Sequence, residues 1–198
     1  MESLILMASL FLWSIIHSVM ASLWIKDFIR RRLGERVFRY YRMFYNIFAG
    51  LSLLPIVGLM FILGDHQLYS ILKPWVVFFL FVQFLSLMAL MVGLKQTGAL
   101  EFLGLNAFIG KDETGSQKFS TRGLYGIVRH PLYSAGLVFL WFSPVMTRNS
   151  LLVSICLSIY LFVGALIEER KLIIEYGDIY REYRKMVPMM IPGIKWNK

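Results

Sequence analysis

The 198-residue sequence contains a single cysteine, Cys156, and three histidines, which lie far apart at positions 17, 66 and 130. One cysteine excludes a disulfide framework. The scattered histidines lack the spacing of metal ligands, so we expect no metal site. Charged residues are also scarce, at 17% of the chain against about 25% in an ordinary soluble domain. These shortages together argue against a water-soluble fold.

Hydrophobic residues, in contrast, make up 58% of the chain and are concentrated in five long runs. A helix needs roughly 20 apolar residues to cross a hydrocarbon layer of about 30 Å. We therefore predict one all-α domain over residues 1–198, a polytopic membrane protein of five transmembrane helices. The first run lacks a basic leader, so we expect it to be a mature span. The runs cover about residues 3–24, 43–63, 71–94, 132–147 and 150–167.

The last two runs are short, and only a few polar residues around Arg148 separate them. We expect these two spans to form a tight antiparallel hairpin. It follows a three-span N-terminal part, residues 1–94, and belongs to the C-terminal part, residues 95–198.

The net charge of +9 does not form a continuous basic face of the kind that binds nucleic acid. The basic residues occur in blocks between the apolar runs. Counting alternate connections, 19 of the 21 Lys and Arg residues fall on one side of the membrane. The positive-inside rule then predicts an outside N-terminus and a cytosolic C-terminal helical segment. The long connection 95–129 and the tail 168–198 share the cytosolic side, where we expect the chemistry.

Polar residues gather where the fourth and fifth spans meet that side. Arg129 and His130 precede Pro131, which suits the first turn of a helix. Glu168 and Glu169 end the fifth span, and carboxylates there need partners. Because the hairpin returns the chain to the side that it left, we expect both pairs to lie close together. Interfacial anchoring of the first pair, and a structural ion pair for the second, are the alternatives.

Beyond the glutamates, Gly177 is expected to break the helix and Asp178 to cap a new one. Tyr180, Tyr183 and Met186 would share a face of that helix, which lies on the bilayer or roofs a pocket.

Three further features have simple explanations. His17 and Asn46, inside the first two spans, are typical of hydrogen bonds between membrane helices, and Cys156 of packing. The polar run 110–120 is expected to be a loop that orders over a ligand.

The C-terminal motifs resemble the isoprenylcysteine carboxyl methyltransferase-like superfamily of integral-membrane methyltransferases, which includes phospholipid N-methyltransferases. The resemblance covers about residues 117–192. It rests on Gly123-Leu124-Tyr125, Arg129-His130-Pro131-Leu132-Tyr133, Glu168-Glu169, Tyr176-Gly177-Asp178-Ile179-Tyr180-Arg181-Glu182-Tyr183 and Val187-Pro188. The N-terminal half is similar to the methanethiol S-methyltransferase and NnrU-type branch in His17-Ser18, Ala21-Ser22, Tyr45-Asn46, Gln96 and Phe102-Leu103-Gly104-Leu105.

The resemblance implies S-adenosylmethionine as the methyl donor and, by position, a set of donor contacts. These are Gln117, Lys118, Phe119, Ser120, Tyr125, His130, Pro131, Leu132, Tyr133 and Glu169. The sequence departs from the carboxyl methyltransferases in two places. Their His-x-Leu-Val stretch is here replaced at residues 117–120, and Gly164 stands where they place an arginine suited to a substrate carboxylate.

The sequence therefore predicts a membrane methyltransferase that acts on a membrane-associated acceptor. We expect this acceptor to be a thiol or a lipid, and to be a small amphiphilic or lipid-like molecule. Arg129, His130 and Glu168 are the candidate catalytic residues, with Glu169 on the donor's polar groups and Arg129 opposite its carboxylate. His130 would assist ionisation of a thiol. The alternatives are carboxyl methylation of prenylcysteine, N-methylation of a phospholipid, and a non-catalytic membrane scaffold. A transporter would need ionisable groups near mid-membrane.

Overall fold

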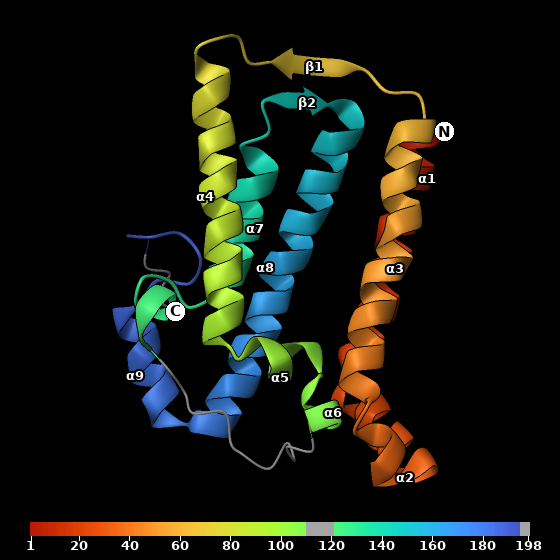
Figure 1. Cartoon of the computed structure of the whole chain (residues 1–198), viewed down its shortest axis with the longest axis vertical. Coiled ribbons are helices and arrows are strands. Elements are labelled where there is room, and N and C mark those ends of the chain that lie inside the picture. Colours follow the sequence, from red (N-terminus) through yellow and green to blue (C-terminus); the bar gives the residue numbers. More distant parts are fainter. Residues whose placement is uncertain (110–120, 195–198) are drawn as a thin grey trace. The chain divides into compact units, whose positions relative to one another are not determined.

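The computed structural model describes residues 1–109 and 121–194, and it is almost entirely helical (Figure 1). Within these residues, four helices are long and apolar enough to cross a membrane. The prediction of an all-α polytopic membrane protein is confirmed. The four helices are α1 (Glu2–Ala21), α3 (Tyr41–Ile62), α4 (Trp75–Gln96) and α8 (Arg148–Tyr176).

The remaining elements are short. They are α2 (Leu23–Phe38), α5 (Ala99–Leu103), α6 (Asn106–Ile109), the 3-10 helix η1 (Gly123–Gly126), α7 (Pro131–Trp141), α9 (Asp178–Met186), and the strands β1 (Gln67–Ser70) and β2 (Val145–Thr147). Of the described residues, 1–66, 97–109 and 147–156 form unit 1, and 67–96, 121–146 and 157–194 form unit 2. The prediction of one domain over residues 1–198 stays a prediction.

The fourth predicted span, residues 132–147, differs from expectation. Its helix, α7, has only 11 residues, so it is roughly 16 Å long and too short to cross the hydrocarbon layer alone. α7 ends at Trp141, shortly before Pro144, and a proline disfavours helical backbone at the residue before it. Residues 145–147 then pair as β2 with β1. The chain then turns directly into α8, so the expected hairpin is present with one short arm.

The other predicted spans match their helices to within a few residues, except that α8 is longer than expected. It begins after Thr147, whose Oγ1 accepts a hydrogen bond from the backbone N–H of Ser150 (3.2 Å). The Asp65 carboxylate adds a second cap by accepting the backbone N–H of Asn149 (3.0 Å). The helix runs on to Tyr176, so Glu168 and Glu169 lie within its last third.

In unit 1, α1 packs against α3. Leu6 and Leu10 form an apolar core with Ile56. His17 is hydrogen-bonded to the Tyr45 hydroxyl, which confirms the prediction of an inter-helix hydrogen bond for this histidine.

In unit 2, α4 packs along α7 (Figure 1). The Trp141 indole N–H donates to Ser158 Oγ (2.9 Å) across the hairpin. Within α8, Ala165 packs with Met189 and Met190 from the end of the described chain. The helix α9 and η1 lie at the same end of this unit as the last turns of α8 (Figure 1).

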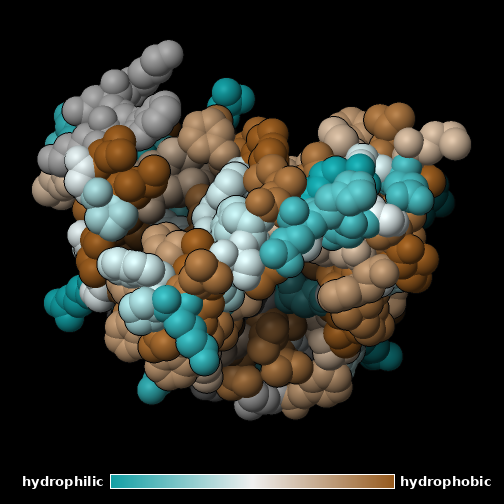
Figure 2. Space-filling view, turned by 90° about the horizontal axis from the view of Figure 1, so that it is seen from above, coloured by the Kyte–Doolittle hydropathy of each residue, from teal (hydrophilic) through white to brown (hydrophobic). Residues whose placement is uncertain are grey.

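Apolar side chains cover much of the outside, as Figure 2 shows in brown. Phe61 and Leu72, for example, are 84% and 78% exposed. A membrane protein presents such residues to lipid tails, whereas a monomeric soluble protein rarely exposes a large apolar patch.

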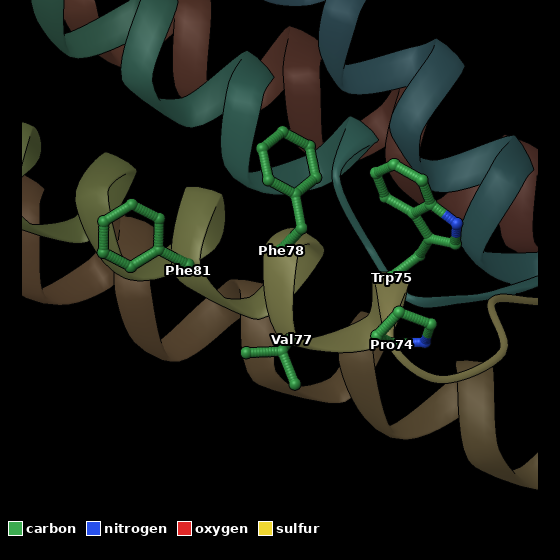
Figure 3. Close-up of a pocket in the computed structure, with 5 residues that line it drawn as sticks. All are labelled: Pro74, Trp75, Val77, Phe78 and Phe81. Atoms are coloured by element: carbon green, nitrogen blue, oxygen red, sulfur yellow. The ribbon is translucent and has the colours of Figure 1, made fainter.

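A hollow of about 570 Å³ lies on unit 2 near the start of α4 (Figure 3). Its lining is apolar and consists of Pro74, Trp75, Val77, Phe78 and Phe81. The other end of α4 contacts η1, so this hollow is a helix length away from the charged residues of unit 2. It offers no group that would orient a charged methyl donor.

Candidate functional site

The site begins at η1, the Gly-x-Tyr motif. Gly123 has a positive φ of 64° and lies directly against the Gln96 side chain, so a Cβ would overlap the Gln96 amide. Gln96 Oε1 accepts the backbone N–H of Leu124 (3.2 Å). Tyr125, at the third position of the motif, has its carbonyl bonded by the hydroxyl of Tyr183 (2.6 Å). Glycine is therefore required here to seat the turn that carries Tyr125.

The next residues are held by the end of the chain. The backbone N–H groups of Arg129 and His130 donate to the carbonyls of Pro188 (2.9 Å) and Met189 (3.0 Å). Ser134 Oγ donates to the carbonyl of Met190 (2.6 Å). These bonds explain why the Val187-Pro188 motif accompanies the Arg-His-Pro motif more than fifty residues away.

The predicted helix start at Pro131 is confirmed, because Pro131 opens α7 and His130 is its N-cap. The side chain of Leu132 lies against α4 at Gly93, at a distance of 2.8 Å from where a Cβ would be. Of the two predicted donor contacts Pro131 and Leu132, the first is buried and the second packs on this neighbouring helix.

The structure brings Arg129 and His130 to Glu169, as the hairpin argument predicts. Arg129 Nε lies 2.7 Å and His130 Nε2 3.4 Å from Glu169 Oε1. Arg184 Nε, from α9, lies 3.2 Å from Glu169 Oε2. The Glu169 side chain is only 4% exposed, so its charge is balanced inside the protein by these three partners. An uncompensated carboxylate would not be stable at such a position.

Glu168 has different surroundings. Its side chain is 47% exposed, and Oε2 accepts a hydrogen bond from the Tyr133 hydroxyl (2.9 Å). His130 Nδ1 lies 3.7 Å from the same oxygen. The His130 and Tyr133 rings are stacked, with centroids 5.4 Å apart and planes within 3°. A carboxylate that reaches solvent is thus set beside two aligned rings.

The helix α9 closes the other side of the cluster. Tyr180 and Tyr183 are buried, whereas Met186, the last residue of α9, is 65% exposed. The prediction that the three share a face stays a prediction, and only the two tyrosines are covered by the protein. Asp178 is not the cap either: Gly177 takes the N-cap position, and Asp178 pairs with Arg181 (2.6 Å) in the first turn.

Burial governs the ionisation of the tyrosines around the cluster. It raises the pKa of the Tyr125 hydroxyl to about 12, and the nearby Glu168 carboxylate adds to the rise. Burial also raises the pKa of Tyr180 and of Tyr183. These hydroxyls stay protonated at neutral pH and can donate hydrogen bonds.

Four predicted donor contacts, Gln117, Lys118, Phe119 and Ser120, lie outside the described residues, as does the predicted loop over residues 110–120. Sequence reasoning missed Arg184, the third cation on Glu169. The sequence spacing could have indicated it. Arg184 follows Tyr180 by four residues, so both side chains lie on the same face of the helix and point into the protein.

These features define the class of the protein. It is an integral membrane protein with a buried cluster of Arg129, His130 and Glu169, which the partly buried Arg184 joins, beside a half-exposed carboxylate, Glu168. Within residues 1–109 and 121–194, no group of three or more His, Cys, Asp or Glu side chains is arranged to hold a metal ion.

Comparison with known proteins identifies its relatives. The chain is 34% identical over 96% of its length to methanethiol S-methyltransferase 1 of Bradyrhizobium diazoefficiens, and the alignment covers 66% of that protein. It is 43% identical over 44% of its length to methanethiol S-methyltransferase 2 of the same organism, covering 34% of it. It is 40% identical over 39% of its length to the methanethiol S-methyltransferase of Crocosphaera subtropica, covering 30% of it.

The chain is therefore related, along nearly all of its length, to the methanethiol S-methyltransferases. The resemblance predicted from its motifs is confirmed in that branch. The chain spans about two thirds or less of the curated relatives that it matches. No family model matches the sequence, and no solved structure matches it.

Proposed function

We propose that this protein is a membrane methyltransferase that transfers the methyl group of S-adenosylmethionine to a small thiol. The observation that carries the proposal is the difference between the two adjacent carboxylates. Glu169 is buried in ion pairs, whereas Glu168 is half-exposed and accessible to a ligand. The names of the relatives supply the reaction class and favour a thiol over a prenylcysteine carboxylate or a phospholipid amine.

The exposed residues of the site suit this donor. A sulfonium cation is attracted to aromatic faces and to carboxylates, and the stacked rings of His130 and Tyr133 stand beside the Glu168 carboxylate. Tyr125 is a half-buried ring near the same carboxylate. These residues, together with residues 117–120, form the proposed donor site.

Glu169 has an organising role in this proposal. Its carboxylate fixes Arg129, His130 and Arg184 and thereby sets the orientation of the His130 ring. Direct contact of Glu169 with the donor, as the family resemblance implies, remains a prediction. Arg129 likewise acts as a positioning residue, since it also donates from Nη1 to the Arg184 carbonyl (2.8 Å).

The reaction is a displacement at the methyl carbon of the donor. The bond from this carbon to the positively charged donor sulfur breaks while the acceptor sulfur forms a new bond to the same carbon. The protein has to hold the two reacting atoms about 3–3.5 Å apart and in line. Glu168 takes up the proton that the thiol loses, and the electron pair of the thiol sulfur forms the new bond. The Tyr133 hydroxyl holds the Glu168 carboxylate in place for this step.

The acceptor space lies one helical turn before Glu168. Apart from the local backbone of α8 and the neighbouring residues in the chain, no atom of the described residues comes within 4 Å of where a Cβ at Gly164 would be. No side chain of residue 164 is present to pair with a substrate carboxylate, so this space suits a small uncharged acceptor that enters from the membrane.

Substrate screening of the purified protein tests the acceptor class. We expect labelled methyl from the donor to appear on a short alkyl thiol, and not on a prenylcysteine carboxylate or a phosphatidylethanolamine amine. Gly164→Arg should reduce thiol turnover by filling the space, and Gly164→Ala should preserve it. Turnover of the lipid amine with no turnover of any thiol would refute the proposed acceptor.

The orientation is part of the proposal, with an outside N-terminus and a cytosolic donor site. In a Cys156→Ser background, His66→Cys should react with a membrane-impermeant maleimide added to intact cells, and Lys185→Cys should react only after lysis. The opposite pattern would invert the assignment.

A further inference from the structure

The helix α2 is the most strongly charged element of unit 1. Seven basic residues lie between Lys26 and Arg42, against only two acidic ones, Asp27 and Glu35. Within the described chain no residue of α2 is buried. Two of its aromatic side chains are open as well, with Trp24 at 72% and Phe28 at 49% exposed. A helix with this combination needs a partner that accepts both charge and apolar surface.

The chain keeps α2 at the membrane surface. Only Ser22 separates α2 from the membrane helix α1, and Arg39 and Tyr40 separate it from α3. One residue spans at most about 3.6 Å, so α2 has no linker with which to leave the height at which α1 ends. Ser22 Oγ accepts the backbone N–H of Ile25 (3.4 Å) and starts α2 at that point.

Cations and aromatic rings are interspersed along α2, which is kinked at Gly34 (φ 78°). The Trp24 and Phe28 rings are stacked (6.2 Å between centroids), and the Arg32 guanidinium lies 5.8 Å from the Phe28 ring. Arg30 is occupied inside the helix, because Nε pairs with Glu35 (3.1 Å) and the guanidinium lies 4.3 Å from the Phe38 ring. Aromatic rings at this height suit the zone between headgroups and tails, and cations suit anionic phosphates.

We propose that α2 is a binding surface for anionic phospholipids, whose headgroup phosphates contact Arg31, Arg32 and Arg36 while Trp24 and Phe28 enter the interface. Charge complementarity selects these lipids. The surface would concentrate anionic lipid around unit 1 independently of methyl transfer.

Lipid retention tests the proposal. The protein is reconstituted in nanodiscs of equimolar phosphatidylglycerol and phosphatidylcholine and extracted in mild detergent, and the retained lipids are quantified by mass spectrometry. We expect phosphatidylglycerol to be enriched several-fold. The triple variant Arg31→Gln/Arg32→Gln/Arg36→Gln should bring the retained ratio close to that of the disc, whereas Arg30 and its partners are left intact.

The control variant is Arg181→Gln/Lys185→Gln on α9. Each of these cations pairs with an acidic residue of the same helix, Asp178 (2.6 Å) or Glu182 (2.7 Å), so retention should not change. If the triple variant fails to fold, the wild-type protein still tests the proposal. Salt at about 1 M shortens the electrostatic screening length to about 3 Å and should abolish the enrichment of phosphatidylglycerol.

Equal retention of both lipids by the wild type would overturn the proposal. So would full enrichment in a folded triple variant, or enrichment unchanged by salt. Preference for a short DNA duplex over phosphatidylglycerol vesicles would assign the surface to nucleic acid and overturn it as well.

Discussion

Glu168 and Glu169 are adjacent in sequence, but their side chains are 47% and 4% exposed. Consecutive residues of an α-helix point about 100° apart, so only one of the two can face Arg129 and Arg184. Glu169 occupies that position, and Glu168 is left beside Tyr133 at the surface of the site. Substitution of Glu169 should therefore lower the stability of the fold, whereas substitution of Glu168 should lower methyl transfer.

Glu169→Gln should destabilise the fold. It leaves the buried Arg129 and the partly buried Arg184 without their carboxylate, and breaking a buried ion pair such as Arg129–Glu169 costs about 3–5 kcal/mol. We expect a clear fall in the thermal unfolding temperature in detergent. Glu168→Gln is the matched control and should unfold near the wild-type temperature while losing methyl transfer. Equal unfolding temperatures for both variants would contradict the organising role of Glu169.

Tyr133→Phe should lower turnover about tenfold and leave folding unchanged. The substitution keeps the ring that stacks on His130 and removes only the hydroxyl that donates to Glu168. A hydrogen bond to a half-exposed carboxylate contributes roughly 1–2 kcal/mol, which corresponds to this change in rate. Steady-state kinetics on the short-chain thiol measure it. Unchanged kcat in this variant would remove Tyr133 from the proposed chemistry.

Gly123→Ala should cost about 1–2 kcal/mol, because a side chain at positive φ is strained and its Cβ would displace Gln96 from Leu124. Gly164→Ala is the control. Position 164 is inside a helix with open space around it, where alanine is favoured over glycine. Chemical unfolding of the two variants should show a loss only for Gly123→Ala. Equal stabilities would mean that the Gly-x-Tyr turn is not constrained.

Alkaline pH should destabilise the site through Tyr125. Its folded-state pKa of about 12 lies above the ordinary tyrosine pKa of 10.0, so the fold favours the protonated hydroxyl. The stabilisation is complete below pH 10 and is lost as the pH rises towards 12. Unfolding temperatures measured across this window should fall less steeply in Tyr125→Phe than in the wild type or in Tyr69→Phe, a control in β1. Parallel curves for all three would contradict the assignment.

Much of the fold could be predicted from the sequence, because long apolar runs allow few alternatives in a membrane. The short α7 was missed, although Pro144 carried the signal. The meeting of Arg129 and His130 with the glutamates followed from the hairpin alone. Which glutamate is buried could not be predicted, since it depends on the rotation of α8 against α7. Arg184 was missed because α9 has several cations, and only its helix phase singles out the one that turns inward.

Calorimetric titration of the detergent-purified protein with S-adenosylhomocysteine, the product form of the donor, tests the central claim most directly. The account predicts saturable binding by the wild type and much weaker binding by folded His130→Ala and Glu168→Gln. Absence of binding in a folded wild-type sample, also after lipid is added, would contradict a methyl-donor site and favour a membrane scaffold.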